Sequence, residues 1–74
     1  MYTQEDIKLE NLNNSTIAYL IKEWIHSKRD RRILYMKYID GITYEKISED
    51  CDMSVRQVKQ ITKDGCEYLL DKIK

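Results

Sequence analysis

The chain has 74 residues, with 13 basic and 13 acidic side chains, so its formal net charge is zero. This length allows one small domain, whose core is marginal unless its helices pack well or the chain pairs with a partner. No proline and only two glycines favour a compact helical protein over a disordered one. No apolar run reaches the roughly 18 residues of a membrane span, and the polar start is unlike a secretory signal, which together predict a cytoplasmic protein without a membrane partner.

Side chains that bind metals or carry out catalysis are scarce. Cys51, Cys66 and His26 are the only cysteines and the only histidine, whereas a tetrahedral zinc site needs about four such ligands. We therefore interpret both cysteines as reduced core residues and expect neither a metal nor another cofactor. His26 and Ser27 adjoin at a predicted helix end, which indicates a cap rather than a nucleophile pair. The sequence predicts no enzyme.

The first predicted elements are an N-terminal arm or short helix over residues 1–14 and a helical domain over residues 15–74. The segment "LNNST" separates them, because Asn and Ser favour helix caps over helix interiors. We expect Trp24, the single tryptophan, to be a core anchor of the helix that follows. Five apolar side chains recur in that helix with the spacing of one buried stripe: Ile17, Leu20, Ile21, Trp24 and Ile25.

A second helix is predicted to begin after Ser27. Ser27 and Asp30 have the spacing of a capping box, and the acid suits the positive end of a helix. The turn at Asp40 and Gly41 ends this helix. Three side chains form its inward face, namely Ile33, Leu34 and Tyr38, and five basic ones are left mostly outside, namely Lys28, Arg29, Arg31, Arg32 and Lys37.

A third, short helix is predicted from Thr43 to Cys51, with Thr43 as its N-cap. Asp52 adopts the left-handed conformation more readily than most residues and so suits the turn that follows. Ser54 and Gln57 then form a second capping box and start a helix with no obvious end before the last residue. Gly65 is expected to permit close packing of this last helix. Its buried face is predicted to hold Val58, Ile61, Leu69 and Ile73, with Cys66 and Leu70 beside them.

Two helices joined by a turn of three or four residues form a helix-turn-helix, whose second helix enters the major groove of DNA. Residues 43–64 fit this motif, with Asp52 and Met53 in the turn. The fold class is therefore predicted to be all-α, a small helical bundle with a helix-turn-helix, like a winged-helix domain without a wing. Five side chains of the second helix are left facing outward: Val55, Arg56, Lys59, Gln60 and Lys63.

The charges are sorted along the chain although they sum to zero. Residues 28–38 carry a net charge of +4, residues 39–53 carry −4 and residues 54–63 carry +3. Two basic segments that fold onto one surface would make a nucleic-acid footprint. The alternative is that each segment is a solvated helix face.

The stretch "SKRDRRILYMKYIDGITYEKISEDCDMSVRQVKQITKDGCEYLLDKI" resembles region 4 of bacterial sigma-70-type RNA polymerase sigma factors. The matching residues lie in the second helix and in the helix-turn-helix: Ser27, Arg29, Asp30, Ile33, Leu34, Lys37, Tyr38, Ile42, Thr43, Glu45, Ile47, Met53, Ser54, Val58, Lys59, Gln60, Ile61 and Leu69. The family reads the −35 promoter element with the start of its second helix. The resemblance therefore implies that Val55, Arg56, Lys59 and Gln60 face the bases, and that Arg29 and Lys37 lie near the DNA backbone.

The departures from the family pattern lie at the reading positions. Val55 stands where an arginine is usual, Arg56 where a glutamate is usual, and Gln57 where another arginine is usual. We therefore expect a target other than the usual promoter element. The chain lacks room for the other sigma regions, so the resemblance implies a small stand-alone regulator of the kind found in phages and mobile elements.

The function predicted is a sequence-specific regulator of transcription that binds double-stranded DNA and associates with the bacterial nucleoid. The alternative is a protein-interaction module that docks on RNA polymerase or on a sigma factor. A homodimer is a further alternative, since one recognition helix covers only a half-site. The predicted phosphate contacts are Lys28, Arg29, Arg31, Arg32, Thr43, Ser54 and Lys63.

Overall fold

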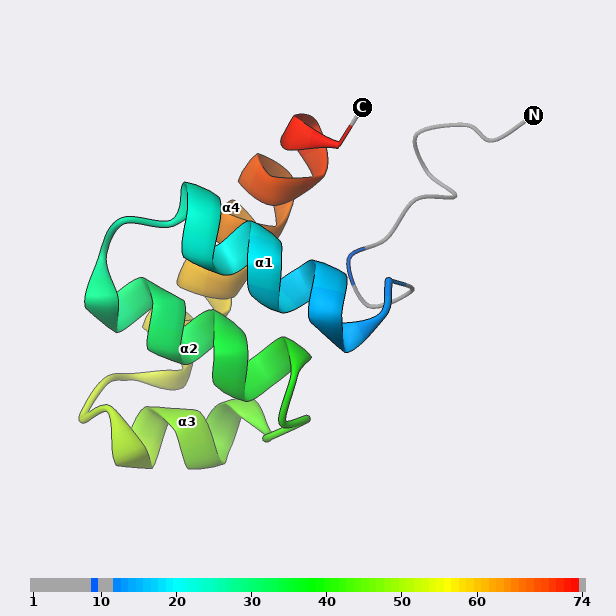
Figure 1. The fold of residues 1–74 in the computed structure, drawn as a ribbon. Coiled ribbons are helices and arrows are strands. Elements are labelled where there is room, and N and C mark those ends of the chain that lie inside the picture. The colour runs from blue at the N-terminus through cyan, green and yellow to red at the C-terminus, as the bar shows by residue number, and fades with distance from the viewer. Residues whose placement is uncertain (1–8, 10–11, 74) are drawn as a thin grey trace.

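The computed structural model describes residue 9 and residues 12–73. This part of the chain forms four helices and no strand: α1 (Asn14–Trp24), α2 (Lys28–Tyr38), α3 (Tyr44–Asp50) and α4 (Val55–Lys72). Helices α1, α2 and α3 follow one another across the molecule, and α4 packs behind all three (Figure 1). The all-α class and the helix-turn-helix are thus as predicted. Most of the arm predicted over residues 1–14 lies outside the described residues.

Each helix begins at a polar N-cap whose side-chain oxygen accepts a hydrogen bond from the backbone N–H three residues later. The caps predicted at Ser27, Thr43 and Ser54 are confirmed, with donor–acceptor distances of 3.3, 3.2 and 3.1 Å. Asn13 caps α1 in the same way at 2.8 Å, so this helix begins inside the predicted break. Gly41 follows the end of α2 in a left-handed conformation (φ 69°), which confirms the predicted turn.

The buried apolar side chains of the described residues gather in two clusters. The bundle core contains Leu9, Ile17, Leu20, Ile21, Ile25, Leu34 and Leu69. The helix-turn-helix core contains Ile33, Met36, Ile47 and Val58. Ile33 and Leu34 are neighbours in α2 and belong to different cores. Helix α2 therefore joins the bundle formed with α1 to the helix-turn-helix formed by α3 and α4.

Gly65 allows α4 to lie directly against α2. A Cβ atom placed on Gly65 would stand 2.7 Å from Cδ1 and 3.2 Å from Cγ of Leu34. Leu34 is fully buried, so its side chain has little room to move away. The predicted close packing is confirmed, and the glycine stays inside α4 without ending it.

The prediction that Trp24 anchors the core is wrong. Trp24 is the last residue of α1 and is 38% exposed. The backbone becomes extended at Ile25, and this turns the Ile25 side chain into the bundle core instead. The ring of Trp24 lies 4.8 Å from Nζ of Lys72, near the end of α4. A helical stripe thus predicts burial only as far as the helix continues.

Thr62 is buried although no apolar pattern marked it. Its hydroxyl donates a 2.9 Å hydrogen bond to the carbonyl oxygen of Lys59, so its polar atom is satisfied inside the protein. Cys51 and Cys66 are half-buried free thiols. The described residues contain no group of potential metal ligands, and none of the helices in this part is long and apolar enough to cross a membrane.

Candidate nucleic-acid interface

The turn between α3 and α4 fixes where the second helix starts. Cys51 is the C-cap of α3, and Asp52 adopts the predicted left-handed conformation with φ 53°. The N–H of Met53 donates to the carbonyl oxygen of Ser48 at 2.9 Å, and the half-buried Met53 side chain packs against the helix-turn-helix core. The predicted turn of Asp52 and Met53 is therefore confirmed.

Ser54 and Gln57 hold the first turn of α4 in a reciprocal capping box. Gln57 N–H donates to Ser54 Oγ at 3.1 Å, and Ser54 N–H donates to Gln57 Oε1 at 3.0 Å. Two otherwise unpaired backbone donors are satisfied in this way. The side chains of Ser54 and Gln57 are thus occupied with the helix start.

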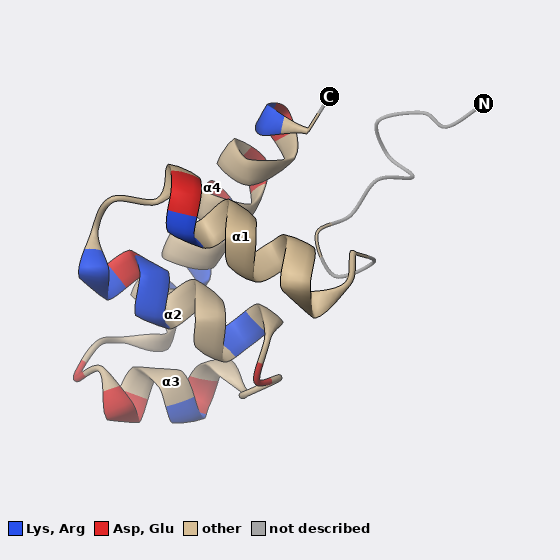
Figure 2. Cartoon of the chain, viewed as in Figure 1, with Lys and Arg blue, Asp and Glu red and all other residues tan. Residues whose placement is uncertain are grey.

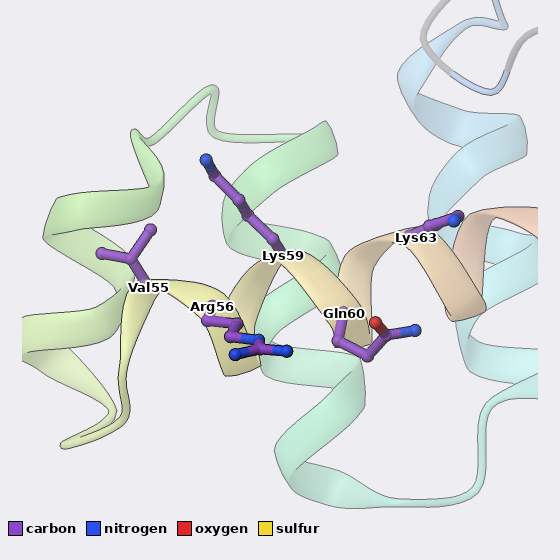
Figure 3. Close-up of a pocket in the computed structure, with 5 residues that line it drawn as sticks. All are labelled: Val55, Arg56, Lys59, Gln60 and Lys63. Atoms are coloured by element: carbon purple, nitrogen blue, oxygen red, sulfur yellow. The ribbon is translucent and has the colours of Figure 1, made fainter.

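The predicted outward face of α4 is a shallow, open depression (Figure 3). Its lining consists of the five residues expected there: Val55, Arg56, Lys59, Gln60 and Lys63. Val55 is half-buried and the other four are exposed. None of the three cationic side chains forms an ion pair with a residue in the described part of the chain. The face therefore presents uncompensated positive charge together with an amide.

The sequence profile of the family described as Sigma-70, region 4 matches residues 27–67. These residues run from the N-cap of α2 into the second half of α4 and make up more than half of the chain. The chain belongs to the sigma-70 region 4 family. No significant match was found among curated proteins or among solved structures. Domains of this family bind DNA through a helix-turn-helix and act in transcription, so DNA is a partner of this region 4 domain.

Gln60 has a neighbour that sequence reasoning passed over. Its Nε2 donates a 2.9 Å hydrogen bond to Oδ1 of Asp64, one turn further along α4. Asp64 is the first acid after the acid-free stretch from Met53 to Lys63, and side chains four apart meet on a helix. This spacing could have revealed the pair. The contact orients the Gln60 amide and leaves its Oε1 atom and its second N–H available to a ligand.

The predicted phosphate contacts on α2 lie near its N-terminal end. Lys28, Arg29 and Arg32 are exposed there, and Arg29 Nε lies 3.2 Å from Oδ1 of Asp30. None of them lines the depression on α4. In Figure 2 the first turns of α2 are mainly basic, whereas α3 below them carries mainly acids. In α3 one of these acids is paired, since Lys46 Nζ lies 3.5 Å from Asp50 Oδ1.

Arg31 has structural partners that its place in a basic segment did not suggest. Its Nε donates to the carbonyl oxygen of Ile25, and its Nη2 donates to that of Lys22 at 3.0 Å. Both carbonyls belong to the end of α1, where the last carbonyl groups lack partners within the helix. Arg31 is half-buried and joins α1 to α2. Its partners come from another helix end, so periodicity within α2 held no sign of them.

Tyr44 lies next to one lysine from each of the two basic segments. Nζ of Lys37, in the last turn of α2, lies 4.2 Å from the centre of the Tyr44 ring. Nζ of Lys59, in α4, lies 5.6 Å from the same centre. Tyr44 is not among the site residues predicted from the sequence. No signal could have found this group, because its members lie on three helices and are linked only by folding.

Proposed function

We propose that this region 4 domain is a sequence-specific regulator of transcription that places the first turns of α4 in the major groove of double-stranded DNA. The observation that carries the proposal is the depression of five residues on α4. It combines three cations that form no ion pair with a described residue and one oriented amide. A major groove admits an α-helix, and its base edges are read by such side chains.

Three side chains of the depression each suit a particular contact with a base. Arg56 can donate two hydrogen bonds to the O6 and N7 atoms of a guanine. The free Oε1 of Gln60 can accept a hydrogen bond from N6 of an adenine, and its free N–H can donate one to N7. Val55 can contact only an apolar group such as the methyl of a thymine. These three residues differ in chemistry, which is what a sequence preference requires.

The exposed cations outside the base-reading residues suit the DNA backbone. Lys28, Arg29 and Arg32 at the start of α2 and Lys63 on α4 are exposed. Contacts of this kind fix the position of a protein on DNA and make its affinity depend on salt. Thr43 and Ser54 stand at helix starts, where their hydroxyl groups accept capping bonds. We assign the main phosphate contacts to the four cations and weaker ones to the hydroxyls of Thr43 and Ser54.

The proposal is tested by selection from a random duplex library with the purified protein, followed by anisotropy titration of the winner at two salt concentrations. We expect one enriched motif. Arg56→Ala and Gln60→Ala should each cost about 1–3 kcal/mol on the selected duplex and relax the preference at one base pair. A symmetric motif would show that two copies bind together.

The matched control is Lys46→Ala, which removes an exposed lysine of α3 that is paired with Asp50. It should keep the full sequence preference. If Arg56→Ala and Gln60→Ala bind all duplexes as the wild type does, the assignment of base contacts is wrong. If no motif is enriched, the domain is not a sequence-specific regulator.

A second candidate function, docking on RNA polymerase, is favoured by exposed aromatic side chains at the ends of α1 and α4. Trp24 and Tyr68 are 38% and 42% exposed, and Lys72 Nζ lies 4.8 Å from each ring centre. Aromatic residues are enriched at the centres of protein interfaces. Polymerase pull-down in the absence of DNA tests this role, with Trp24→Ala and Tyr68→Ala expected to reduce capture. Equal capture of wild type and both variants would exclude this surface.

A further inference from the structure

We propose that Asp64 is a positioning residue that sets the base preference of α4, because it holds the Gln60 amide in an orientation that fits adenine and rejects guanine. Asp64 does not line the depression on α4 and acts only through Gln60. The inference rests on the proposed DNA binding and deepens it. It names a residue outside the depression that decides which base Gln60 reads.

The geometry determines which end of the Gln60 amide faces Asp64. Nε2 of Gln60 donates to Oδ1 of Asp64 at 2.9 Å. In Figure 3 the amide nitrogen of Gln60 accordingly points toward Lys63 and the later turns of α4. Residues four apart are neighbours on a helix surface, so α4 alone keeps the two side chains within reach of each other. The pair needs no other element of the protein to form.

The carboxylate of Asp64 can hold only the nitrogen end of this amide. A carboxylate accepts hydrogen bonds and donates none, whereas an amide donates through its nitrogen and accepts through its oxygen. A reversed amide would place Oε1 of Gln60 against Oδ1 of Asp64, two acceptors with no hydrogen between them. Asp64 takes part in neither of the ion pairs found among the described residues, so its charge acts on the amide in full. One orientation of Gln60 is therefore favoured over the other.

The amide held in this way matches adenine and does not match guanine. With one N–H engaged by Asp64, Gln60 presents one donor and one acceptor to a base. Adenine offers an acceptor at N7 and a donor at N6, whereas guanine offers acceptors at both N7 and O6. On guanine, Oε1 of Gln60 would face O6 and repel it. A Gln60 released from Asp64 could turn both of its N–H donors to guanine, so the loss of Asp64 should weaken the discrimination between the two bases.

The bond between Gln60 and Asp64 becomes stronger when the helix lies on DNA. Both side chains are exposed in the free protein, where water competes for their hydrogen bonds. A helix that enters the groove displaces part of this water. The lower local dielectric then strengthens a hydrogen bond to a charged acceptor. The orientation of the amide is thus enforced at the step where one base is compared with another.

The test uses two duplexes that differ only at the base pair where Gln60→Ala relaxes the preference of the wild type. There the wild type should favour adenine over guanine by about 10-fold, the usual order for one bidentate contact. Asp64→Asn keeps the shape of the side chain but can bond to either end of the Gln60 amide. It should lower the ratio of the two affinities to about 2-fold or less, and Asp64→Ala should lower it similarly. Anisotropy titration measures both affinities.

The matched control is Glu67→Gln, which removes an exposed acid from the same helix seven residues beyond Gln60. Removal of either acid reduces the repulsion of phosphate, which changes the affinity for all sequences by a common factor. Only Asp64→Asn should therefore change the ratio between adenine and guanine. In a Gln60→Ala background, Asp64→Asn should leave the ratio unchanged, which shows that Asp64 acts through Gln60. An unchanged circular dichroism spectrum checks that each variant is folded.

Modified bases then identify the atoms that Gln60 reads. 7-Deazaadenine lacks the N7 acceptor, and unsubstituted purine lacks the amino group on C6. Each replacement in the selected duplex should weaken binding of the wild type by about 5-fold, the loss expected for one hydrogen bond. Asp64→Asn should lose less with each replacement, because its Gln60 amide is no longer held in one orientation.

The outcomes separate this inference from the proposed function. If a motif is selected and Asp64→Asn keeps the wild-type ratio, Asp64 is not a positioning residue and the regulator stands. If Glu67→Gln lowers the ratio as much as Asp64→Asn does, the effect belongs to the charge of the helix and the inference is wrong. An effect of Asp64→Asn that persists without Gln60 contradicts it as well. If no motif is enriched, Gln60 reads no base and both proposals fail.

Discussion

The bundle and the helix-turn-helix of this domain are held together in different ways. Among the described residues, the bundle core contains seven buried apolar side chains, whereas the helix-turn-helix core contains four. The helix-turn-helix adds a reciprocal capping box at Ser54 and a left-handed residue at Asp52. Burial of apolar surface is non-directional, while caps and turns fix backbone angles. The body of the domain thus depends on burial, and the position of the recognition helix depends more on local backbone geometry.

The largest effect is expected from Leu69→Ala in the bundle core. Leu69 is fully buried, and its truncation leaves a cavity that should cost about 2–5 kcal/mol of unfolding free energy. Urea unfolding followed by circular dichroism measures this loss. The matched control is the half-buried neighbour Leu70→Ala, which should cost less. Similar small losses in both variants would show that the bundle does not depend on burial in this way.

Asp52→Val should have the next largest effect, at the turn of the helix-turn-helix. A β-branched residue at φ 53° is strained, which should cost about 1–2 kcal/mol. Asp52→Gly is the control, because glycine adopts this conformation without strain and should stay within about 1 kcal/mol of the wild type. The same unfolding titration compares the two. Equal stability of both variants would contradict a role for backbone geometry here.

Ser54→Ala is expected to have the smallest effect of the three, about 1 kcal/mol, because it removes one N-cap. The control is Ser48→Ala, since the Ser48 hydroxyl donates within α3 to the carbonyl oxygen of Glu45 at 2.7 Å. A surface change of this kind is usually within about 0.5 kcal/mol. Thermal unfolding of the two variants measures the difference. If both lose the same stability, the capping box contributes nothing beyond an ordinary surface hydroxyl.

The features that the sequence predicted are those encoded by a few adjacent residues. Ser27, Thr43 and Ser54 were predicted as caps because a cap needs only its own side chain and the next turn of helix. Asp52 in the turn and Gly65 at the close contact were predicted from the conformational preferences of single residues. The five residues of the outward face of α4 follow from helical periodicity alone.

Two of the features that were missed follow from the end of α1. Trp24 is exposed because α1 stops at that residue, and Arg31 bonds to the carbonyls that this stop leaves open. Thr62 tolerates burial because its hydroxyl bonds to the carbonyl oxygen of Lys59, a contact that no apolar pattern shows. Tyr44 gathers lysines from two other helices. Arg31 and Tyr44 thus depend on contacts between helices, whereas the bond of Thr62 lies within α4.

Because α4 continues without a break past Gly65, its two ends move together as one rigid element. Its 18 residues span about 27 Å at 1.5 Å per residue, with the depression that begins at Val55 in the first half and the Leu34 contact in the second. A rotation of about 10° at the DNA end would move the far end by about 5 Å over such a length. If α4 enters DNA as proposed, a partner held at Trp24, Tyr68 and Lys72 would therefore be displaced by a change in the angle of α4 on the duplex.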